Sequence, residues 1–427
     1  MSNYQESLAY LYSLQFFGIK LGLENIRKLL SSVGNPQQHL RIIHIAGTNG
    51  KGSTAAALAS IFHVAGIPAG LYTSPHLHSF TERIRIDTRQ ISELEAVELI
   101  EELRPHAEAL RATFFEFTTA MALLCFQRRG VQWAILETGL GGRLDATNVV
   151  IPELCLVTPV ALDHTAYLGS KLTEVAAEKA GIFKSGVAVI SAYQEAAVAA
   201  VLQQRAAELN IPLLEFGQDY HWHNQGDSFT IAGGSPLLDE IRAEQAGEHQ
   251  QQNFALAAAA IDYLSQAGLE ISAAEIQQGL RKVSWPGRLE WLSDRILLDG
   301  AHNPAGAKKL AAYLQQQNLA DLHLIVGCKG DKQSSELITE LLPFVSCVYA
   351  TQPPVDAVVP VAEIVQQVRE AAIPVSGYVD PVAALQAAMV NRAPEDIILV
   401  AGSLFLVAEI RDFLLSGVDS LAITVGE

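Results

Sequence analysis

A glycine-rich run near the start of the chain has the residue types and spacing of a phosphate-binding loop. The run 46–54 reads Ala-Gly-Thr-Asn-Gly-Lys-Gly-Ser-Thr, follows the apolar stretch 41–45 and precedes a helical pattern. Backbone N–H groups of such a turn point at an anion, and the ammonium of Lys51 can reach the terminal phosphates of a nucleotide. The hydroxyl of Ser53 or Thr54 can bind a magnesium ion. The run therefore predicts nucleotide binding but no particular reaction.

This loop departs from the usual phosphate-loop pattern at two positions. The pattern has Gly at the position of Ile45, and Ser or Thr at the position of Gly52. An ordinary glycine-rich turn between a strand and a helix is therefore an alternative. The strand before the run and the helix after it favour phosphate binding, because that context is part of the motif.

Polar residues also stand at or just after the ends of other apolar, strand-like stretches: Ser74, Glu137 and Asp299. Open α/β sheets bind ligands at this end of their strands. In phosphate-loop proteins an acid placed like Glu137 often acts on the magnesium ion, and Asp299 can accept hydrogen bonds from ribose hydroxyls. A plain turn at Ser74 and a surface carboxylate in a flexible loop at Glu137 are the alternatives.

Four further positions have plainer explanations beside the functional ones. His164 follows a strand-like stretch, but a lone histidine is more often structural than a ligand. Lys179 lies on an otherwise apolar helix face, and its ammonium could simply reach solvent. Asn303-Pro304 and Gly402-Ser403 could be no more than helix caps.

The composition indicates a globular protein of more than one domain. The chain has 427 residues, of which 49% are apolar and 18% charged, and its formal net charge is −17. This length predicts two or three domains. The negative charge argues against a nucleic-acid or anionic-membrane partner, because the field of the whole molecule repels polyanions. No apolar run approaches the ~20 residues of a membrane helix.

The cysteines and the N-terminus bear on the compartment. Cys125, Cys155, Cys328 and Cys347 stand in apolar runs without a C-x-x-C pair, which predicts buried free thiols in a reducing cytosol. The segment 1–6 lacks a basic region leading into an apolar one, so no secretory signal is expected. We therefore expect a cytoplasmic protein.

Strand-like and helix-like segments alternate along almost the whole chain, which predicts an α/β fold with mainly parallel sheets. In the first part the expected strands are 41–45, 68–72, 131–137, 153–158 and 187–191. The expected helices there are 23–33, 54–65, 92–111, 114–128, 172–180, 195–208 and 248–267. The more polar residues 210–245 predict an irregular or antiparallel excursion.

A second alternation begins near residue 295 and predicts an independent, smaller doubly wound domain. Its expected strands are 296–298, 322–326, 345–349 and 397–401, and its expected helices are 304–317, 333–342, 360–372 and 381–391. Pro286 and Gly287 break the preceding helical pattern. The predicted domains are therefore 1–287 and 288–427.

Taken together, these segments resemble the folylpolyglutamate synthase/dihydrofolate synthase family of the Mur-ligase group, whose members form amide bonds with ATP. The pair Gly52-Ser53, unusual by the general pattern, is typical of this family. The resemblance covers nearly the whole chain and rests on segments 17–23, 44–53, 73–77, 82–85, 137–148, 162–164, 178–182, 285–290, 299–304 and 402–405. It implies a Mur-ligase-like phosphate-loop ATPase domain with a mainly parallel sheet, followed by the smaller doubly wound α/β domain.

The resemblance also implies roles for individual residues. The nucleotide-binding residues would be Thr48, Asn49, Gly50, Lys51, Gly52, Ser53, Asn253, Arg288 and Asp299. The magnesium ligands would be Ser74, Glu137 and His164, together with Lys179 if carbon dioxide carboxylates its amine. The pterin or folate would lie against Lys20, Leu21, Gly22, Thr113, Phe114, Phe115, Glu116, Leu144, Asp145 and Ala146, although at least one of the two phenylalanines is expected to pack in the core. His302 and Ser403 would shape the glutamate site, and Lys51, Lys179, Asp299 and His302 would take part in catalysis.

The activity that the resemblance implies is addition of L-glutamate to dihydropteroate, to folate (poly)glutamates, or to both. The γ-phosphoryl group of ATP would pass to the substrate carboxylate, and the amine of glutamate would then displace phosphate. Two magnesium ions, small-molecule partners and a monomeric protein are expected. One alternative is another amide ligase of the group, acting on a cell-wall precursor or an amino-acid polymer. The second is a nucleotide switch without ligase activity, against which the complete second domain argues.

Overall fold

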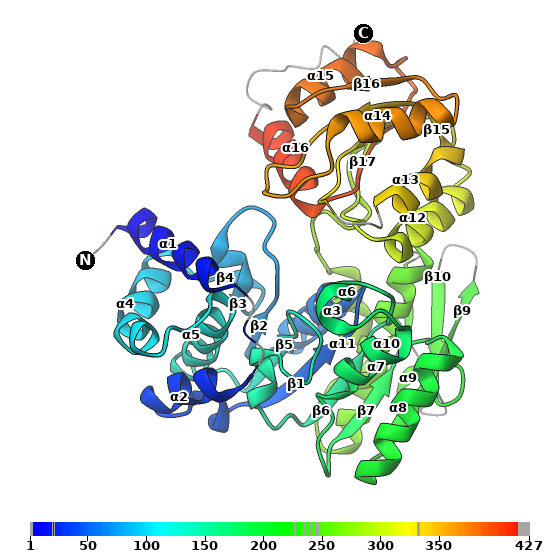
Figure 1. The fold of residues 1–427 in the computed structure, drawn as a ribbon. Helices are drawn as coiled ribbons and strands as arrows, with labels where there is room; N and C mark the ends of the chain where they lie inside the picture. The colour runs from blue at the N-terminus through cyan, green and yellow to red at the C-terminus, as the bar shows by residue number, and fades with distance from the viewer. Residues whose placement is uncertain are drawn as a thin grey trace. The chain divides into compact units, whose positions relative to one another are not determined.

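The computed structural model describes residues 3–18, 20, 22–225, 228–233, 236–239, 241–244, 247–330 and 334–416. Backbone contacts divide the chain into two compact units, residues 1–284 and 285–427. Each unit contains its own central sheet (Figure 1).

An eight-stranded sheet forms the centre of the first unit, with strand order β4-β3-β2-β5-β1-β6-β7-β8. The strands are β1 (Arg41–Ala46), β2 (Ala69–Tyr72), β3 (Ile84–Ile86), β4 (Arg89–Gln90), β5 (Trp133–Glu137), β6 (Leu154–Val157), β7 (Ala188–Ser191) and β8 (Leu213–Glu215). All pairs from β2 to β8 are parallel, whereas β3 and β4 are antiparallel additions at one edge. The apolar runs of the inner strands follow from their burial on both faces.

Helices cover both faces of this sheet (Figure 1). They are α1 (Tyr4–Ser13), α2 (Glu24–Ser32), α3 (Lys51–Val64), α4 (Glu93–Leu110), α5 (Phe114–Arg128), α6 (Thr165–Leu168), α7 (Leu172–Ala180), α8 (Ala196–Leu209), α9 (Pro236–Asp239), α10 (Glu248–Gln266) and α11 (Ala273–Arg281). Short 3-10 helices are η1 (Leu14–Phe17), η2 (Pro36–His39), η3 (Phe80–Arg83) and η4 (Ala146–Val149). The seven expected helices are confirmed, but α3 begins at Lys51 rather than at residue 54.

Helix α3, which follows the phosphate loop, is buried around its whole circumference. Residues 53–62 are all buried, and most of them are small. Helix α11 lies against α3 because Gly279 has no side chain: a Cβ there would stand 2.6 Å from Cα of Ile61. Ser60 donates to the carbonyl oxygen of Gly279 across the same contact, over 2.7 Å. The loop is thus carried by a helix that is held on several sides.

The expected excursion between residues 210 and 245 is confirmed as mainly antiparallel. After β8 joins the central sheet, β9 (His221–Gln225), β10 (Ser228–Ala232) and β11 (Arg242–Glu244) form a separate three-stranded antiparallel sheet in the order β11-β10-β9. The buried residues Phe229 and Ile231 alternate with less buried neighbours, as expected for a sheet with one covered face.

The second unit is the predicted doubly wound domain. Its strands are β12 (Glu290–Ser293), β13 (Ile296–Leu298), β14 (Leu322–Val326), β15 (Val345–Ala350), β16 (Val375–Gly377) and β17 (Ile398–Ala401). They are ordered β12-β13-β17-β14-β15-β16, and every pair except β12–β13 is parallel. The helices are α12 (Pro304–Gln316), α13 (Ser334–Leu341), α14 (Val361–Glu370), α15 (Pro381–Asn391) and α16 (Leu404–Ser416), with the 3-10 turn η5 (Leu342–Phe344). The short edge strands β12 and β16 were not predicted.

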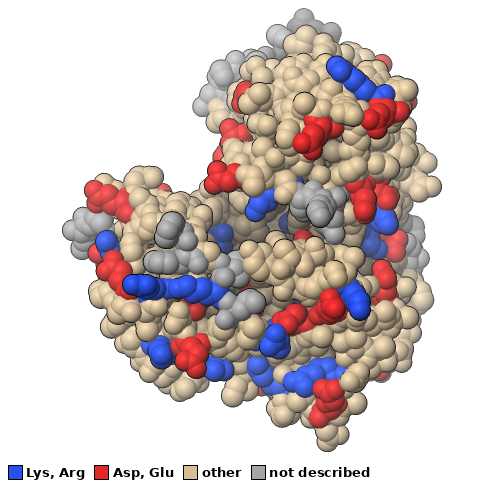
Figure 2. Space-filling model, viewed as in Figure 1, with Lys and Arg blue, Asp and Glu red and all other residues tan. Residues whose placement is uncertain are grey.

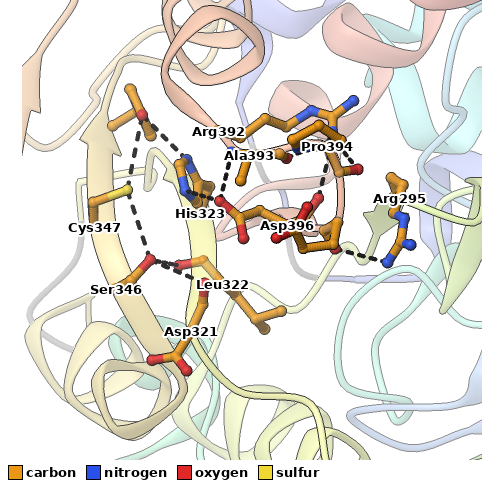
Figure 3. Close-up of polar contacts among 12 residues, drawn as sticks. Arg295, Asp321, Leu322, His323, Ser346, Cys347, Arg392, Ala393, Pro394 and Asp396 are labelled. Atoms are coloured by element: carbon orange, nitrogen blue, oxygen red, sulfur yellow. Dashed lines mark hydrogen bonds and ion pairs between the residues drawn. The ribbon is translucent and has the colours of Figure 1, made fainter.

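A polar network lies within this second sheet (Figure 3). The buried ring of His323 lies 3.2 Å from the Asp396 carboxylate through Nε2 and 3.2 Å from the Tyr349 hydroxyl through Nδ1. The thiol of Cys347 lies 3.8 Å from the same hydroxyl. Mutual hydrogen bonding explains how a histidine is accommodated in a buried strand.

The prediction for the cysteines is confirmed in one respect and wrong in another. All four thiols are free, and Cys125, Cys155 and Cys328 are buried. Cys347 is only partly buried, because the first half of β15 is less covered than the second.

Two observations concern the surface. In the part of the chain that the structure describes, no helix combines the length and the apolar character needed to cross a bilayer. On the face drawn in Figure 2, Lys and Arg side chains lie interspersed with Asp and Glu. The expected absence of a nucleic-acid partner stays a prediction.

Candidate active site

The phosphate loop leaves the middle of the central sheet. Strand β1 lies between β5 and β6, and Ile45 stands opposite both Glu137 and Leu156. The backbone turns through two glycines with positive φ, and α3 starts at Lys51. Gly52 and Ser53 therefore lie in the first helical turn, where backbone N–H groups are free to face an anion.

At two positions of the loop, the backbone conformation and the close packing require glycine. Gly47 and Gly50 have φ values of 148° and 89°. A Cβ on Gly47 would lie 1.8 Å from Oγ1 of Thr158, and one on Gly50 would lie 2.3 Å from Oδ1 of Asn253. Asn253, in α10, is thus packed directly against the loop although it lies 203 positions after Gly50 in the sequence.

Replacing Gly50 by alanine is expected to weaken both stability and ATP binding. The left-handed backbone costs a non-glycine residue about 1–2 kcal/mol, and the new methyl group must also displace Asn253. We expect ATP affinity to fall by at least about tenfold, which corresponds to ~1.4 kcal/mol. The measurements are thermal unfolding and a calorimetric ATP titration.

Gly66→Ala is the matched control for this prediction. Gly66 also has a positive φ, of 68°, but a Cβ there would have no atom within 4 Å. This variant should lose stability through backbone strain and keep its ATP affinity. Equal ATP binding by Gly50→Ala and wild type would contradict the role of the Gly50–Asn253 contact.

The loop that follows β6 holds the phosphate loop in place. The backbone N–H groups of Thr48 and Asn49 donate to the carbonyl oxygen of Pro159, over 3.0 and 3.3 Å. The Thr48 hydroxyl donates to the carbonyl oxygen of Ala161 and accepts from its N–H, both over 3.0 Å. Thr48 therefore supports the shape of the loop with its side chain.

Lys51, Glu137 and Ser74 come together from three segments. The ammonium of Lys51 lies 3.2 Å from the carbonyl oxygen of Thr48 and 3.9 Å from Oε1 of Glu137. Glu137 is only 5% exposed, and its Oε2 accepts a hydrogen bond from the N–H of Ser74 over 3.2 Å. The sequence places these residues at the ends of β1, β2 and β5, which are adjacent in the sheet, and this explains why they meet.

Lys179 is buried beside the phosphate loop, so the alternative of an ammonium in solvent is wrong. The residue is 4% exposed, and its Nζ donates to the carbonyl oxygen of Gly47 over 2.6 Å. Burial, and next the charge of Lys51, lower the pKa of Lys179 to about 7. Near neutral pH a large fraction of this amine is therefore unprotonated.

His164 is more exposed than the other predicted metal ligands. Its backbone is left-handed, with φ of 49°, and its side chain is 56% exposed. Its Nε2 lies 3.9 Å from the carboxylate of Asp163. Among the described residues, no group of three or more His, Cys, Asp and Glu side chains is arranged to hold a metal ion. A site built on Glu137 would therefore need other donors beside it.

The loop after β5 is organised by Asp145. Its Oδ2 accepts from the N–H groups of Gly139 and Leu140, over 2.9 and 2.8 Å. Its Oδ1 accepts from the N–H and the hydroxyl of Thr147, over 3.0 and 2.5 Å. Burial raises the pKa of Asp145, while these hydrogen bonds oppose the shift. The carboxylate thus shapes the loop that also carries the predicted substrate residues Leu144 and Ala146.

The start of α5 brings together the aromatic residues predicted to bind the pterin. Thr113 and Glu116 form a capping box, in which the Glu116 carboxylate accepts from the N–H and the hydroxyl of Thr113 over 2.8 and 2.9 Å. Phe115 packs against Gly139, where a Cβ would lie 2.4 Å from its ring. Phe114 stacks on Tyr12, with ring centroids 6.0 Å apart. Both phenylalanines also pack against the core, which was expected for at least one of them.

The early segment of the predicted substrate site is only partly described. The ammonium of Lys20 donates to the carbonyl oxygen of Arg111, over 2.8 Å, near the start of α5. Gly22 has a positive φ of 145°. Leu21 lies outside the described residues.

In the second unit the predicted residues gather at the end of β13. The buried carboxylate of Asp299 accepts from the N–H groups of Leu289 and Ala301, both over 2.9 Å. Burial raises the pKa of Asp299, whereas the charge of Arg288 opposes this shift. Arg288 donates to the carbonyl oxygen of Gly300, over 3.0 Å, and Nδ1 of His302 lies 2.9 Å from the same oxygen.

Two predicted caps in this unit are confirmed. The side chain of Asn303 accepts from the N–H of Gly306, over 2.8 Å, at the start of α12. Ser403, which is buried, accepts from the N–H of Phe405 over 3.2 Å at the start of α16. Each residue thus has a local structural role, and the proposed role of Ser403 in glutamate binding stays a prediction.

Comparison with known proteins decides the family. Residues 45–261 match the Mur ligase middle domain, and residues 287–404 match the Mur ligase glutamate ligase domain. The chain is 35% identical over 433 residues to the folylpolyglutamate synthase of Lacticaseibacillus casei, covering 97% of this chain and 99% of that one. The chain belongs to the folylpolyglutamate synthase/dihydrofolate synthase family. It is also 32% identical to the dihydrofolate synthase/folylpolyglutamate synthase of Bacillus subtilis, covering 96% of this chain and 98% of that one.

Solved structures of this family have the same fold. The chain matches E. coli FolC in complex with DHPP and ADP with a TM-score of 0.88 and 30% identity, covering 97% of this chain and 98% of that one. The Mur-ligase-like architecture inferred from the sequence is therefore confirmed.

No role was predicted from the sequence for Arg83, which the structure places over the Phe114 ring, or for His76, which is hydrogen-bonded to Arg83. The guanidinium of Arg83, in η3, lies over the Phe114 ring, and its Nε donates to Nδ1 of His76 over 2.8 Å. Both belong to segments that carried the resemblance, Thr73-Ser74-Pro75-His76 and Glu82-Arg83. Their identity was visible in the sequence, but their burial was not.

Proposed function

We propose that this protein is an ATP-dependent ligase that adds L-glutamate to dihydropteroate and also to folate (poly)glutamates. The observation that carries the proposal is the buried carboxylate of Glu137, 3.9 Å from the Lys51 ammonium of a phosphate loop, in a member of this family. The relative from B. subtilis is named for both activities, and E. coli FolC was solved with DHPP and ADP.

The reaction has two steps. An oxygen of the substrate carboxylate attacks the γ-phosphorus of ATP, the bond from that phosphorus to the bridging oxygen breaks, and ADP leaves. The amine of glutamate then attacks the acyl carbon, phosphate leaves, and the amine loses a proton as the amide forms. The protein contributes by positioning the reactants and offsetting charge, and Lys51, at the start of α3, is proposed to offset charge on the transferred phosphoryl group.

Magnesium would be held by the Ser74 hydroxyl, the Glu137 carboxylate and the His164 imidazole. The buried carboxylate at the phosphate loop fits a hard cation, which prefers oxygen donors and keeps several waters. When bound, the ion offsets negative charge on the transferred phosphoryl group. Two ions are proposed, because carboxylation of Lys179 would create a second anion beside the loop.

Lys179 is proposed to react with carbon dioxide. Its neutral amine attacks the carbon of CO₂, a C–N bond forms, and one proton leaves, so that a cation is converted into a carbamate anion. A pKa near neutrality supports this step, because only the unprotonated amine is a nucleophile.

The two parts of the chain are proposed to divide the binding work. Residues 1–287 would bind ATP and the pterin, with Lys20, Gly22, Phe114 and the loop of Asp145 nearest the substrate. Residues 288–427 would contribute Arg288 and Asp299 to the nucleotide, and His302 and Ser403 to glutamate. The protein is proposed to act as a monomer.

A paired assay tests the proposed function. Purified protein, MgATP and L-glutamate are incubated with dihydropteroate in one reaction and with a reduced folate monoglutamate in the other. Mass spectrometry is expected to show a gain of one glutamate residue in the first reaction and of one or more in the second. A gain in only one reaction would leave a single activity. A gain in neither, with ATP still bound, would contradict the folate substrate and point to another Mur-group substrate.

A further inference from the structure

Arg83 is a buried cation in the first unit. It is 8% exposed and ends η3. Its guanidinium carbon lies 5.1 Å from the centroid of the Phe114 ring, within the range of a cation–π contact. Its Nε donates to Nδ1 of His76, over 2.8 Å. The guanidinium is thereby held in a defined orientation by an aromatic face and an imidazole.

The neighbours of Arg83 do not neutralise its charge. No carboxylate among the described residues forms an ion pair with it, although the charges of Glu137 and Glu82 favour its cationic form. Nδ1 of His76 accepts the hydrogen bond from Arg83, and an imidazole carries no negative charge that could offset the guanidinium. Because a buried cation is costly unless it is paired, this arrangement calls for an anion from outside the protein.

The position of Arg83 identifies that anion. One side of the residue contacts Phe114, which is proposed to bind the pterin. The main chain of Arg83 is bonded to the segment that leads to Ser74: its carbonyl oxygen accepts from the N–H of Thr73 over 3.1 Å, and the N–H of Ser74 donates to Oε2 of Glu137. Arg83 thus contacts Phe114 through its side chain, and its main chain is bonded to the residue before Ser74, a proposed magnesium ligand. Dihydropteroate carries its carboxylate at the end opposite the pterin ring system. This carboxylate is the group that is phosphorylated, so it must lie between the ring system and the γ-phosphate of ATP.

We propose that the Arg83 guanidinium binds the acceptor carboxylate of dihydropteroate and orients it toward the γ-phosphate of ATP. This inference rests on the proposed function. Arg83 presents its two terminal nitrogens as donors, a geometry that matches a carboxylate. His76 and Phe114 act as positioning residues, since they hold the guanidinium rather than the substrate carboxylate.

Titration with two ligands distinguishes carboxylate binding by Arg83 from a purely structural role of this residue. The full-length protein is titrated calorimetrically with dihydropteroate and with its analogue in which hydrogen replaces the carboxylate. Wild type is expected to bind the carboxylate compound about ten- to a hundredfold more tightly, the range for a charged hydrogen bond. In Arg83→Gln this preference should shrink to about twofold, while binding of the analogue stays unchanged.

Two further variants secure the test. Arg83→Lys keeps the positive charge but lacks the two terminal nitrogens of the guanidinium, so its preference for the carboxylate compound should be intermediate. This variant replaces Arg83→Gln in the test if Arg83→Gln does not fold. Arg89→Met removes an exposed arginine of the neighbouring strand β4 and should keep the full preference. Equal weakening of both ligands, or an unchanged preference in both Arg83 variants, would overturn the inference while the paired assay still supports the ligase. Wild type that neither binds nor converts dihydropteroate would overturn both.

Discussion

Replacing Lys51 by methionine is expected to abolish nearly all glutamate ligation. The Lys51 ammonium lies at the start of α3, 3.2 Å from the Thr48 carbonyl oxygen and 3.9 Å from Glu137, where the terminal phosphates of ATP are proposed to bind. Methionine keeps the apolar stem and removes the charge. Loss of one cation that stabilises a transferred phosphoryl group typically lowers turnover by about a hundred- to a thousandfold, and we expect the upper end. The measurement is ADP release with saturating dihydropteroate and glutamate.

The control for Lys51 is Lys184→Met. Lys184 is another partly buried lysine of the first unit, and its ammonium donates to the side chain of Asn148 over 2.7 Å. This variant removes the same charge away from the phosphate loop and should keep most of the turnover. Wild-type turnover in Lys51→Met would refute the assignment of the loop.

Replacing Lys179 by methionine is expected to have a comparable effect on turnover. If Lys179 carries a carbamate in the active enzyme, its loss removes an anion proposed to hold magnesium, and added bicarbonate should not restore activity. The wild-type protein prepared without carbon dioxide should be less active and should recover when bicarbonate is added. Native mass spectrometry of wild type should show the added mass of one CO₂, which Lys179→Met should lack.

The low pKa of Lys179 also predicts a pH-dependent stability difference in buffer free of carbon dioxide. The amine has a pKa of about 7 in the folded protein and about 10.4 when unfolded. The cost of burying the cation is therefore present in full below pH 7 and is relieved as the pH rises toward 10. The free energy of unfolding of wild type, relative to Lys179→Met, should increase by up to roughly 1.4 kcal/mol per pH unit in this window.

Lys171→Met is the control for both measurements on Lys179. Lys171 precedes the same helix, α7, and is exposed. Its removal should change neither the turnover nor the pH dependence. Full turnover in Lys179→Met would contradict the catalytic assignment, and a stability difference that is constant between pH 7 and 10 would contradict the pKa.

Local sequence patterns predicted most of the fold. Apolar runs such as 133–136 and 154–157 specify strands that are covered on both faces, and they became β5 and β6. The alternation of strands and helices indicated the parallel sheets and the second domain. The elements that were missed are mostly short, such as β12 and β16, because three or four residues at a sheet edge carry too little periodicity to be recognised.

The sequence by itself determined the phosphate loop and the polar residues at strand ends, because these depend on neighbours in the chain. Only the tertiary structure decided which distant residues meet them. Asn253 packs on Gly50, and Lys179 reaches the carbonyl oxygen of Gly47, because the strand order and helix packing bring α10 and α7 to the loop. Packing across the chain also buries two cations. It lowers the pKa of Lys179, and it leaves Arg83 without a carboxylate partner among the described residues. No local pattern of residues encodes such burial, since it depends on how separate elements exclude water together.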